Sequence, residues 1–278
     1  MAVSESATGQ LHIVSTPIGN LGDITLRALD TLRSVSAILA EDTRHSRQLV
    51  TRYDITTPLE AYHEHNEARA TPKIIARLMR GESFALITDA GTPLLSDPGL
   101  RLVRAAIDAG VPIVPVPGSS ALLAALVGSG IDAERFTFFG FLPRKGGERV
   151  EALDTLVALP HAAVVYEAAN RLEGTLRDIA GRGAGPREVV VAREMTKQFE
   201  EFRRGTVDAL AEYYAKSTPK GEVVLVLSGA PRSAPDEERL REHARQLRAA
   251  GASTRDIVRL LTRDHGASRN LAYRIAHE

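Results

Sequence analysis

The sequence of 278 residues contains no cysteine and no tryptophan. Without cysteine the chain has no disulfide, no thiolate metal ligand and no thiol nucleophile, and this absence fits a reducing compartment. No run of about eighteen apolar residues occurs, so we expect no membrane-spanning helix. The polar residues 1–10 lack the basic and then apolar layout of a signal peptide. We therefore expect a cytoplasmic globular protein.

The chain also has no net charge, because its 35 basic residues balance 35 acidic ones. The chain as a whole therefore has no electrostatic attraction to nucleic acid. Its basic residues are nevertheless uneven, with thirty arginines and only five lysines. Arginine binds phosphates and stacks on bases better than lysine does. Nucleotide bias in the genome would explain an excess of arginine and alanine equally well, so both interpretations stay open.

The common phosphate-binding motifs are absent too, since the sequence has neither a P-loop nor a G-x-G-x-x-G pattern. Instead, an apolar stretch at residues 84–87 leads into a loop, residues 88–99, that carries carboxylates, hydroxyls, two glycines and two prolines. Open α/β sheets bind small ligands at the carboxyl ends of their strands. Prolines restrict φ and glycines permit turns that other residues disfavour, so such a loop can hold a fixed shape. We therefore expect a site here for a nucleoside-like cofactor without a phosphate.

Short apolar runs alternate with stretches of helical periodicity, which is typical of an α/β fold with a largely parallel sheet. The predicted strands are residues 11–14, 37–40, 59–62, 84–87, 113–116, 136–139, 162–166, 188–192 and 222–227. The predicted helices are residues 25–34, 45–53, 71–80, 99–109, 121–127, 147–158, 170–180 and 207–214. A helix start at residues 117–121 is the candidate boundary between two α/β domains, at 1–117 and 118–230.

The C-terminal part of the sequence is different, because a linker-like stretch at residues 229–238 is followed only by helical patterns. Three short helices are predicted at 238–249, 254–264 and 269–277, so that residues 236–278 form a small helical module similar to a helix-turn-helix. Its excess of basic residues is small. Contact with nucleic acid, dimerisation and capping of the core all remain open roles for this module.

Nine motifs occur in a fixed order along the chain, and together they resemble the tetrapyrrole-methylase superfamily, in particular its branch of bacterial rRNA ribose methylases. The motifs are residues 15–23, 40–44, 62–67, 88–99, 117–121, 140–145, 166–171, 192–197 and 220–222. The superfamily's tetrapyrrole enzymes have a glycine-rich first loop that ends in Gly-Asp. Residues 16–20 of this chain differ from that loop and fit the rRNA branch instead.

The resemblance implies two α/β/α domains of the tetrapyrrole-methylase type with S-adenosylmethionine in the cleft between them. It further implies a homodimer that methylates the 2′-hydroxyl of a cytidine, position 1402 of 16S rRNA, within the 30S ribosomal subunit. By the same resemblance, the cofactor would contact residues of both domains. The implied cofactor-binding residues are Pro17, Gly19, Asp89, Gly91, Thr92, Pro93, Ser119, Ser120, Ala121, Glu167, Met195, Thr196 and Gly221.

Residues 119–121 stand at a predicted helix N-terminus, where free amides and the helix dipole suit the carboxylate of the cofactor. Catalytic candidates follow the second predicted strand: Glu41 and Asp42 as proton acceptors, with Arg44 to hold a phosphate or a carboxylate. The alternative is an acidic helix start with a surface ion pair. The candidate substrate-binding residues are Asn66, Glu67, Arg144, Lys145 and Arg171.

The pair His63 and His65 has a spacing that zinc ligands can use, but a zinc site needs at least three protein ligands and no others are evident. We therefore expect no metal site, although a divalent ion that bridges RNA and protein stays open. Two other functions compete with the rRNA methyltransferase: methylation of a tetrapyrrole such as a precorrin, and a non-catalytic ribosome-binding factor. The identity of the proton acceptor also stays open.

Overall fold

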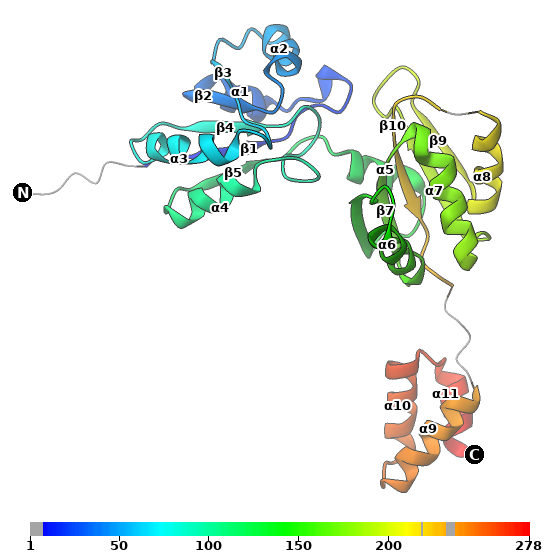
Figure 1. Cartoon of the computed structure of the whole chain (residues 1–278). Coiled ribbons are helices and arrows are strands. Elements are labelled where there is room, and N and C mark those ends of the chain that lie inside the picture. Colours follow the sequence, from blue (N-terminus) through cyan, green and yellow to red (C-terminus); the bar gives the residue numbers. More distant parts are fainter. Residues whose placement is uncertain (1–7, 218, 232–236) are drawn as a thin grey trace, which may run out of the picture. The chain divides into compact units, whose positions relative to one another are not determined.

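The computed structural model describes residues 8–217, 219–231 and 237–278. The chain folds as two compact units, Met1–Gly229 and Ala230–Glu278 (Figure 1). Residues 1–7 of the predicted leaderless N-terminus and residues 232–236 of the predicted linker lie outside the described residues. The first unit contains two sheets, and its division into domains at 1–117 and 118–230 stays a prediction.

The first sheet has the strand order β3-β2-β4-β1-β5, and every pairing in it is parallel. This confirms the parallel sheet that the alternating pattern predicts. Its strands are β1 (Leu11–Val14), β2 (Ala37–Ala40), β3 (Leu59–Ala61), β4 (Phe84–Ile87) and β5 (Ile113–Val116). Its helices are α1 (Leu26–Ser34), α2 (Thr43–Arg52), α3 (Glu67–Leu78) and α4 (Leu100–Asp108).

Helices cover both faces of this sheet because alternate strand residues point to opposite sides. Ile38 and Ala40 pack in one buried cluster with side chains of α1 and α2. Leu39, the residue between them, packs in a second cluster with side chains of α3 and α4. The strands are therefore mainly apolar, with His12 and Glu60 as exceptions, and their polar continuations lie at the carboxyl edge of the sheet.

Helix α3 begins at Glu67, four residues before the start that the sequence predicts. The predicted start was wrong by about one turn, because the helix begins before Pro72, which lies inside it. A proline there removes the hydrogen bond to the carbonyl four residues earlier and crowds that carbonyl. The surrounding turns are retained because Thr71, Ile74 and Leu78 are buried.

The second sheet has the order β6-β7-β10-β8-β9 and is mixed. Strand β6 is parallel to β7, whereas β10 is antiparallel to both β7 and β8, and β9 is antiparallel to β8. The strands are β6 (Phe136–Phe141), β7 (Ala162–Ala168), β8 (Glu188–Arg193), β9 (Glu201–Thr206) and β10 (Glu222–Leu227). The sequence pattern missed β9, because an edge strand can carry charges such as Glu201, Arg203 and Arg204.

Helices cover both faces of the second sheet as well. Helix α5 packs on one face, and α6, α7 and α8 pack on the other. These helices are α5 (Ala121–Ser129), α6 (Gly147–Ala158), α7 (Leu172–Ile179) and α8 (Val207–Lys216). Short helical turns lie at Leu21–Asp23, Ala169–Arg171 and Ala180–Ala184.

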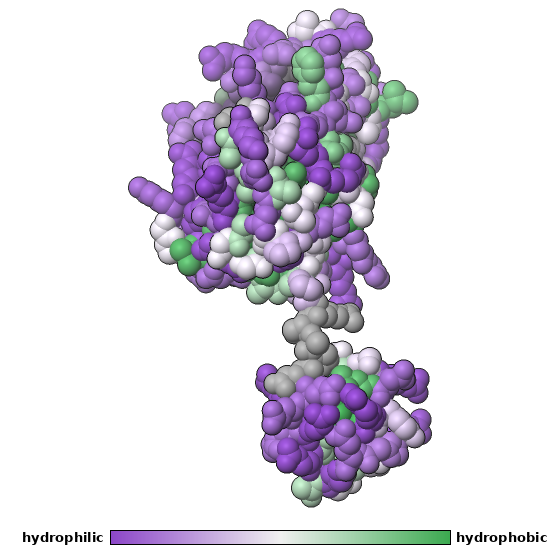
Figure 2. Space-filling model, turned by 90° about the vertical axis from the view of Figure 1, so that its right-hand side faces the viewer, coloured by the Kyte–Doolittle hydropathy of each residue, from purple (hydrophilic) through white to green (hydrophobic). Residues whose placement is uncertain are grey.

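The second unit consists of α9 (Glu237–Ala249), α10 (Thr254–His265) and α11 (Arg269–His277), close to the three predicted helices. The hydroxyls of Ser253 and Ser268 cap α10 and α11, and Gly266 ends α10 in the left-handed conformation. A small apolar core joins all three helices. The face of this unit in Figure 2 is mainly hydrophilic. Within the described ranges, every helix is too short or too polar to cross a bilayer.

Candidate active site

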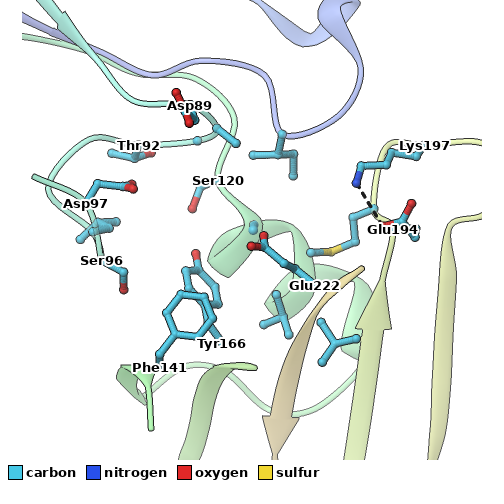
Figure 3. A pocket seen from close by; sticks show the side chains of 18 of the residues that line it. Asp89, Thr92, Ser96, Asp97, Ser120, Phe141, Tyr166, Glu194, Lys197 and Glu222 are labelled. Atoms are coloured by element: carbon cyan, nitrogen blue, oxygen red, sulfur yellow. Dashed lines mark hydrogen bonds and ion pairs between the residues drawn. The ribbon is translucent and has the colours of Figure 1, made fainter. Parts of the chain in front are cut away.

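A cavity of about 310 Å³ lies in the first unit, with walls from both sheets (Figure 3). We call it the inter-sheet cavity. The loop after β4 forms one wall, together with Ile18 after β1 and Glu41 after β2. The N-terminus of α5, the strands β6, β7 and β10, and the loop after β8 form the rest. The carboxylate of Glu222 and the hydroxyl of Tyr166 point into it. Ligand sites of this size, with apolar walls and a few polar groups, are typical of small-molecule binding.

The loop after β4 is held in place by the loop after β1. The backbone amide of Thr16 donates to the carbonyl of Gly91 at 2.8 Å, and the amide of Gly91 donates back at 3.0 Å. Gly91 has φ of +85°, and a Cβ there would stand 3.4 Å from Cγ2 of Ile18. Leu94 and Ser96 also have positive φ. Such conformations persist where the surrounding structure imposes them, so the loop presents a preformed wall.

The N-terminus of α5 forms the opposite part of the wall. Ser120 caps the helix by accepting a hydrogen bond from the amide of Leu123, and the amide of Leu122 donates to the Tyr166 hydroxyl at 3.1 Å. Ser120 and Ala121 line the cavity. A helix N-terminus directed at a cavity favours an anionic group there.

The lining of the inter-sheet cavity is strongly acidic. It contains five carboxylates and one lysine, Lys197, which pairs with Glu194 at 3.0 Å. Burial raises the pKa of Asp97 to about 6, with further contributions from neighbouring carboxylates and an opposing hydrogen bond to Thr88. Burial also raises the pKa of Glu41, and the charge of Asp89 adds to that effect. A cationic ligand would relieve this repulsion.

A wider groove of about 820 Å³ adjoins the inter-sheet cavity, and we call it the acceptor groove. The two spaces share three lining residues, Glu41, Ser96 and Asp97. The far side of the groove is formed by α4, which contributes Arg101 and Arg104. The junction between a cavity for one reactant and a groove for another is therefore marked by two carboxylates with raised pKa values.

The structure brings only part of the predicted cofactor-binding set to the inter-sheet cavity. Pro17 and Gly19 line a separate hollow of about 160 Å³. Pro93, Ser119, Thr196 and Gly221 are next to lining residues in sequence, without being part of the lining. The predicted residues that line the inter-sheet cavity are Asp89, Gly91, Thr92, Ser120, Ala121 and Met195.

Glu167 lies inside the protein rather than at the cavity. Its side chain is fully buried and accepts a hydrogen bond from the hydroxyl of Thr175 at 2.7 Å. It also pairs with the guanidinium of Arg171 at 3.3 Å. Arg171 in turn donates to the carbonyl of Leu142 at 3.1 Å, which ties the end of β6 to β7. These contacts give both residues a structural role, and their contacts with cofactor and substrate stay a prediction.

Of the three predicted catalytic residues, Glu41 lines the cavity, whereas Asp42 and Arg44 are not part of its lining. Glu41 lines both the inter-sheet cavity and the acceptor groove, and it accepts a hydrogen bond from Thr88 at 3.2 Å. Asp42 instead caps α2 by accepting from the amide of Arg44 at 2.8 Å, and it pairs with the Arg44 side chain at 3.3 Å. That guanidinium is 90% exposed. The pair therefore has the geometry of an acidic helix start.

The predicted substrate-binding residues also differ in their placement. Asn66 accepts a hydrogen bond from the amide of His63 and donates to the carbonyl of Ala61, so it holds the turn before α3. Glu67 lines the acceptor groove and pairs with Arg101 at 3.1 Å. Arg144 and Lys145 are exposed after β6. Among the described residues no group of three His, Cys, Asp or Glu side chains is placed to hold a metal ion.

Sequence reasoning missed several residues that line the cavity. Asp97 belongs to the loop that the sequence singled out, but it was not among the predicted site residues. Gly99 is the N-cap of α4, and no side chain caps that helix. Glu222 and Tyr166 come from two strands whose pairing, Val224 opposite Tyr166, the sequence pattern does not reveal. Knowledge of the strand order would have been needed to place them together.

A family model described as tetrapyrrole (corrin/porphyrin) methylases matches residues 10–211. Several curated relatives, each named ribosomal RNA small subunit methyltransferase I, match most of the chain. The relative from Synechocystis is 43% identical over 273 residues, which cover 97% of this chain and 98% of the relative. The relative from Bacillus subtilis is 40% identical, with 98% and 96% covered, and that from Mesorhizobium japonicum is 51% identical, with 81% and 77% covered.

Solved structures share the fold at low sequence identity. Uroporphyrin-III C-methyl transferase from Thermus thermophilus, complexed with S-adenyl homocysteine, has a TM-score of 0.59 at 18% identity. The match covers 79% of this chain and 97% of that one. Diphthine synthase has a TM-score of 0.62 at 13% identity, with 79% and 90% covered. At these identities the likeness shows a shared fold.

Proposed function

Because this chain belongs to the tetrapyrrole (corrin/porphyrin) methylase family, and within it to the group named ribosomal RNA small subunit methyltransferase I, we propose that it methylates 16S rRNA. The methyl group comes from S-adenosylmethionine and goes to the ribose 2′-hydroxyl of a cytidine, position 1402, in the 30S subunit. One observation carries the mechanism: the acidic inter-sheet cavity opens into a second groove at Glu41 and Asp97.

The inter-sheet cavity fits S-adenosylmethionine in charge and in the chemistry of its lining. Its carboxylates suit the sulfonium and ammonium groups, and the N-terminus of α5 suits the carboxylate. Apolar side chains such as Ile18, Leu95 and Met195 offer a slot for the adenine. Between two lining residues, the buried hydroxyl oxygen of Thr196 has no hydrogen-bond partner within the described part of the chain. Such an orphaned group is suited to a ligand.

When bound, S-adenosylmethionine supplies an electrophilic methyl group on a positively charged sulfur. Methyl transfer from sulfur to oxygen needs the two atoms in line and close together. The ribose therefore has to reach the junction of the inter-sheet cavity and the acceptor groove. At that junction Asp97 accepts the proton of the 2′-hydroxyl as the new carbon–oxygen bond forms, and a neutral thioether leaves. Glu41, the second carboxylate there, keeps Asp97 basic.

The acceptor groove contributes cations for the RNA backbone. Arg104 lines it and has no ion pair among the described residues, whereas Arg101 is paired with Glu67. Arg144 and Lys145 are exposed and add two further cations for the RNA. The same proposal includes a homodimer, because the resemblance implies one, and activity in the cytoplasm, where ribosomal RNA is present.

Transfer of tritium from labelled S-adenosylmethionine tests this function. The purified chain would be incubated with 30S subunits, with naked 16S rRNA and with a precorrin. We expect label on the 30S subunit, recovered in an alkali-resistant dinucleotide, because a methylated 2′-oxygen prevents strand cleavage. Label on a base nitrogen or on the precorrin would contradict the proposal. RNA binding without any label would indicate a non-catalytic ribosome-binding factor.

Replacement of Glu222 by glutamine is expected to weaken S-adenosylmethionine binding about tenfold, or about 1.4 kcal/mol. The carboxylate of Glu222 points into the inter-sheet cavity and attracts the cationic sulfur. S-adenosylhomocysteine has a neutral sulfur, so its affinity should change less. Isothermal titration with both ligands measures the difference. Glu212→Gln, which removes an exposed carboxylate on α8, is the matched control; equal losses for both ligands would contradict the charge argument.

A further inference from the structure

The helical unit has a groove of its own, about 1150 Å³ in volume, between α10 and α11. Its lining contains four arginines and one carboxylate, Asp256, so the groove is strongly basic although the chain as a whole is neutral. We call it the arginine groove. Three of its arginines come from α10, and Arg269 is the first residue of α11. This concentration of charge was not visible in the nearly balanced composition of residues 236–278.

The arginines of α10 form a row along one face of the helix. Arg255, Arg259 and Arg263 are four residues apart, a spacing that places them on one face at intervals of about 6 Å along the axis. Asp256 pairs with Arg259 at 2.8 Å, and Asp264 pairs with Arg263 at 2.5 Å. Both pairs are largely exposed, so they hold the arginines only weakly.

Two arginines of the groove have no such partner. Within the part of the chain that the structure describes, the side chains of Arg255 and Arg269 make no hydrogen bond and no ion pair, although the charge of Asp256 acts on Arg255 from nearby. Arg255 stands in the first turn of α10 and Arg269 is the first residue of α11, so each of the two helices presents an arginine without an ion pair at its N-terminus. Charges of this kind are available to an anionic partner at no cost of breaking an existing pair.

An exposed aromatic side chain lies beside these charges. Tyr273 is 60% exposed, and its ring lies 4.3 Å from the ring of His277, centroid to centroid. The core of the unit is formed by other residues, such as Leu240, Ile257 and Leu261. Tyr273 therefore contributes an open ring face next to the row of arginines. Grooves that combine positive charge with exposed aromatic rings bind single-stranded nucleic acid, because the charges follow the phosphates and the rings stack on bases.

We propose that the arginine groove binds the sugar-phosphate backbone of RNA, with Arg255 and Arg269 on phosphates and Tyr273 against a base. A protein partner fits less well, because the centres of protein interfaces are depleted of charge. Val258 is the only aliphatic side chain in the groove's described lining. That the RNA is the 16S rRNA substrate rests on the proposed function, whereas RNA binding by the groove does not. The groove would then anchor the substrate at a site separate from the inter-sheet cavity.

The test compares the full-length chain with its Arg255→Ser/Arg269→Ser variant in binding to naked 16S rRNA at several salt concentrations. We expect about a tenfold loss of affinity at moderate salt, and a log–log salt slope that is smaller by about 1.4, or about 0.7 for each lost phosphate contact. The control is Arg245→Ser/Lys216→Ser, which removes two exposed, ion-paired cations outside the groove. Tyr273→Ala is expected to lower affinity without a change of slope.

Unchanged affinity and slope in the groove variant, with folding confirmed by thermal melting, would overturn the proposal. A loss of affinity for the 30S subunit but not for naked rRNA would overturn it too, and would indicate a ribosomal protein as the partner. The binding measurement needs no methyl transfer, so the two proposals fail separately. Absence of labelled rRNA from the wild-type reaction counts against the proposed function, whereas unchanged binding by the variant counts against the groove.

Discussion

Replacement of Asp97 by asparagine is expected to slow methyl transfer by about 10²–10⁴-fold, the usual contribution of a positioned general base. Asp97 lines both the inter-sheet cavity and the acceptor groove, so it lies where the two spaces meet. Asparagine keeps the shape of the side chain but cannot accept the proton. Single-turnover transfer of labelled methyl to 30S subunits measures the effect.

The pH dependence of the reaction gives a second readout of the same residue. Burial raises the pKa of the Asp97 carboxyl to about 6, so the proton-accepting carboxylate forms only as the pH rises through that value. We therefore expect kcat/KM to rise with pH up to about pH 6 and then to level off. In Asp97→Asn this rise should disappear. The bound sulfonium favours the carboxylate, so the corresponding rise in kcat should occur at lower pH.

Asp108→Asn is the matched control, because Asp108 lines the acceptor groove without bordering the inter-sheet cavity. Its rate and pH profile should equal those of the wild type. A wild-type rate and profile in Asp97→Asn would contradict the proposed role. A large loss in Glu41→Gln together with a small loss in Asp97→Asn would assign proton transfer to Glu41 instead.

Replacement of Arg171 by methionine is expected to destabilise the protein by about 3–5 kcal/mol, the cost of leaving a buried charge without its partner. The Glu167 side chain is fully buried, and Arg171 is its ion-pair partner. Loss of the guanidinium also leaves the carbonyl of Leu142 without its donor. Unfolding in urea, followed by circular dichroism, measures the change.

Arg177→Met is the control for this prediction, since Arg177 forms an exposed ion pair with Glu173 on the same helix. We expect that variant to lose less than about 1 kcal/mol. The double variant Glu167→Gln/Arg171→Met should recover part of the stability, because the buried charge is then gone. Full stability of Arg171→Met combined with weak rRNA binding would support the substrate-binding role that the sequence suggested.

Much of the first unit follows from sequence pattern alone. The strands β1, β2, β4 and β5 were predicted at their observed limits because each is a short, mainly apolar run, and β2 and β4 are buried at every position. The loop after β4 was singled out by its prolines and glycines, and it does form a wall of the cavity. In each case the signal is local: a few adjacent residues determine both the structure and the pattern.

The sequence failed where the deciding contacts are distant along the chain. Strand β9 is charged and was overlooked, since its place at the edge of the sheet depends on pairing with β8. Glu167 of β7 was predicted to bind the cofactor. The structure shows that it contacts Thr175 of α7 and Arg171, and the sequence pattern does not reveal these contacts. The raised pKa of Asp97 comes first from its burial and then from carboxylates that include Glu41 and Glu222, which belong to other elements.

The position of bound S-adenosylmethionine tests the central claim most directly. A crystal structure of the chain with S-adenosylmethionine would locate the donor. The account predicts electron density in the inter-sheet cavity, with the methyl carbon directed at the opening between Glu41 and Asp97, where a ribose oxygen could approach to about 3–3.5 Å. Density outside this cavity, or a methyl group directed away from that opening, would contradict the account.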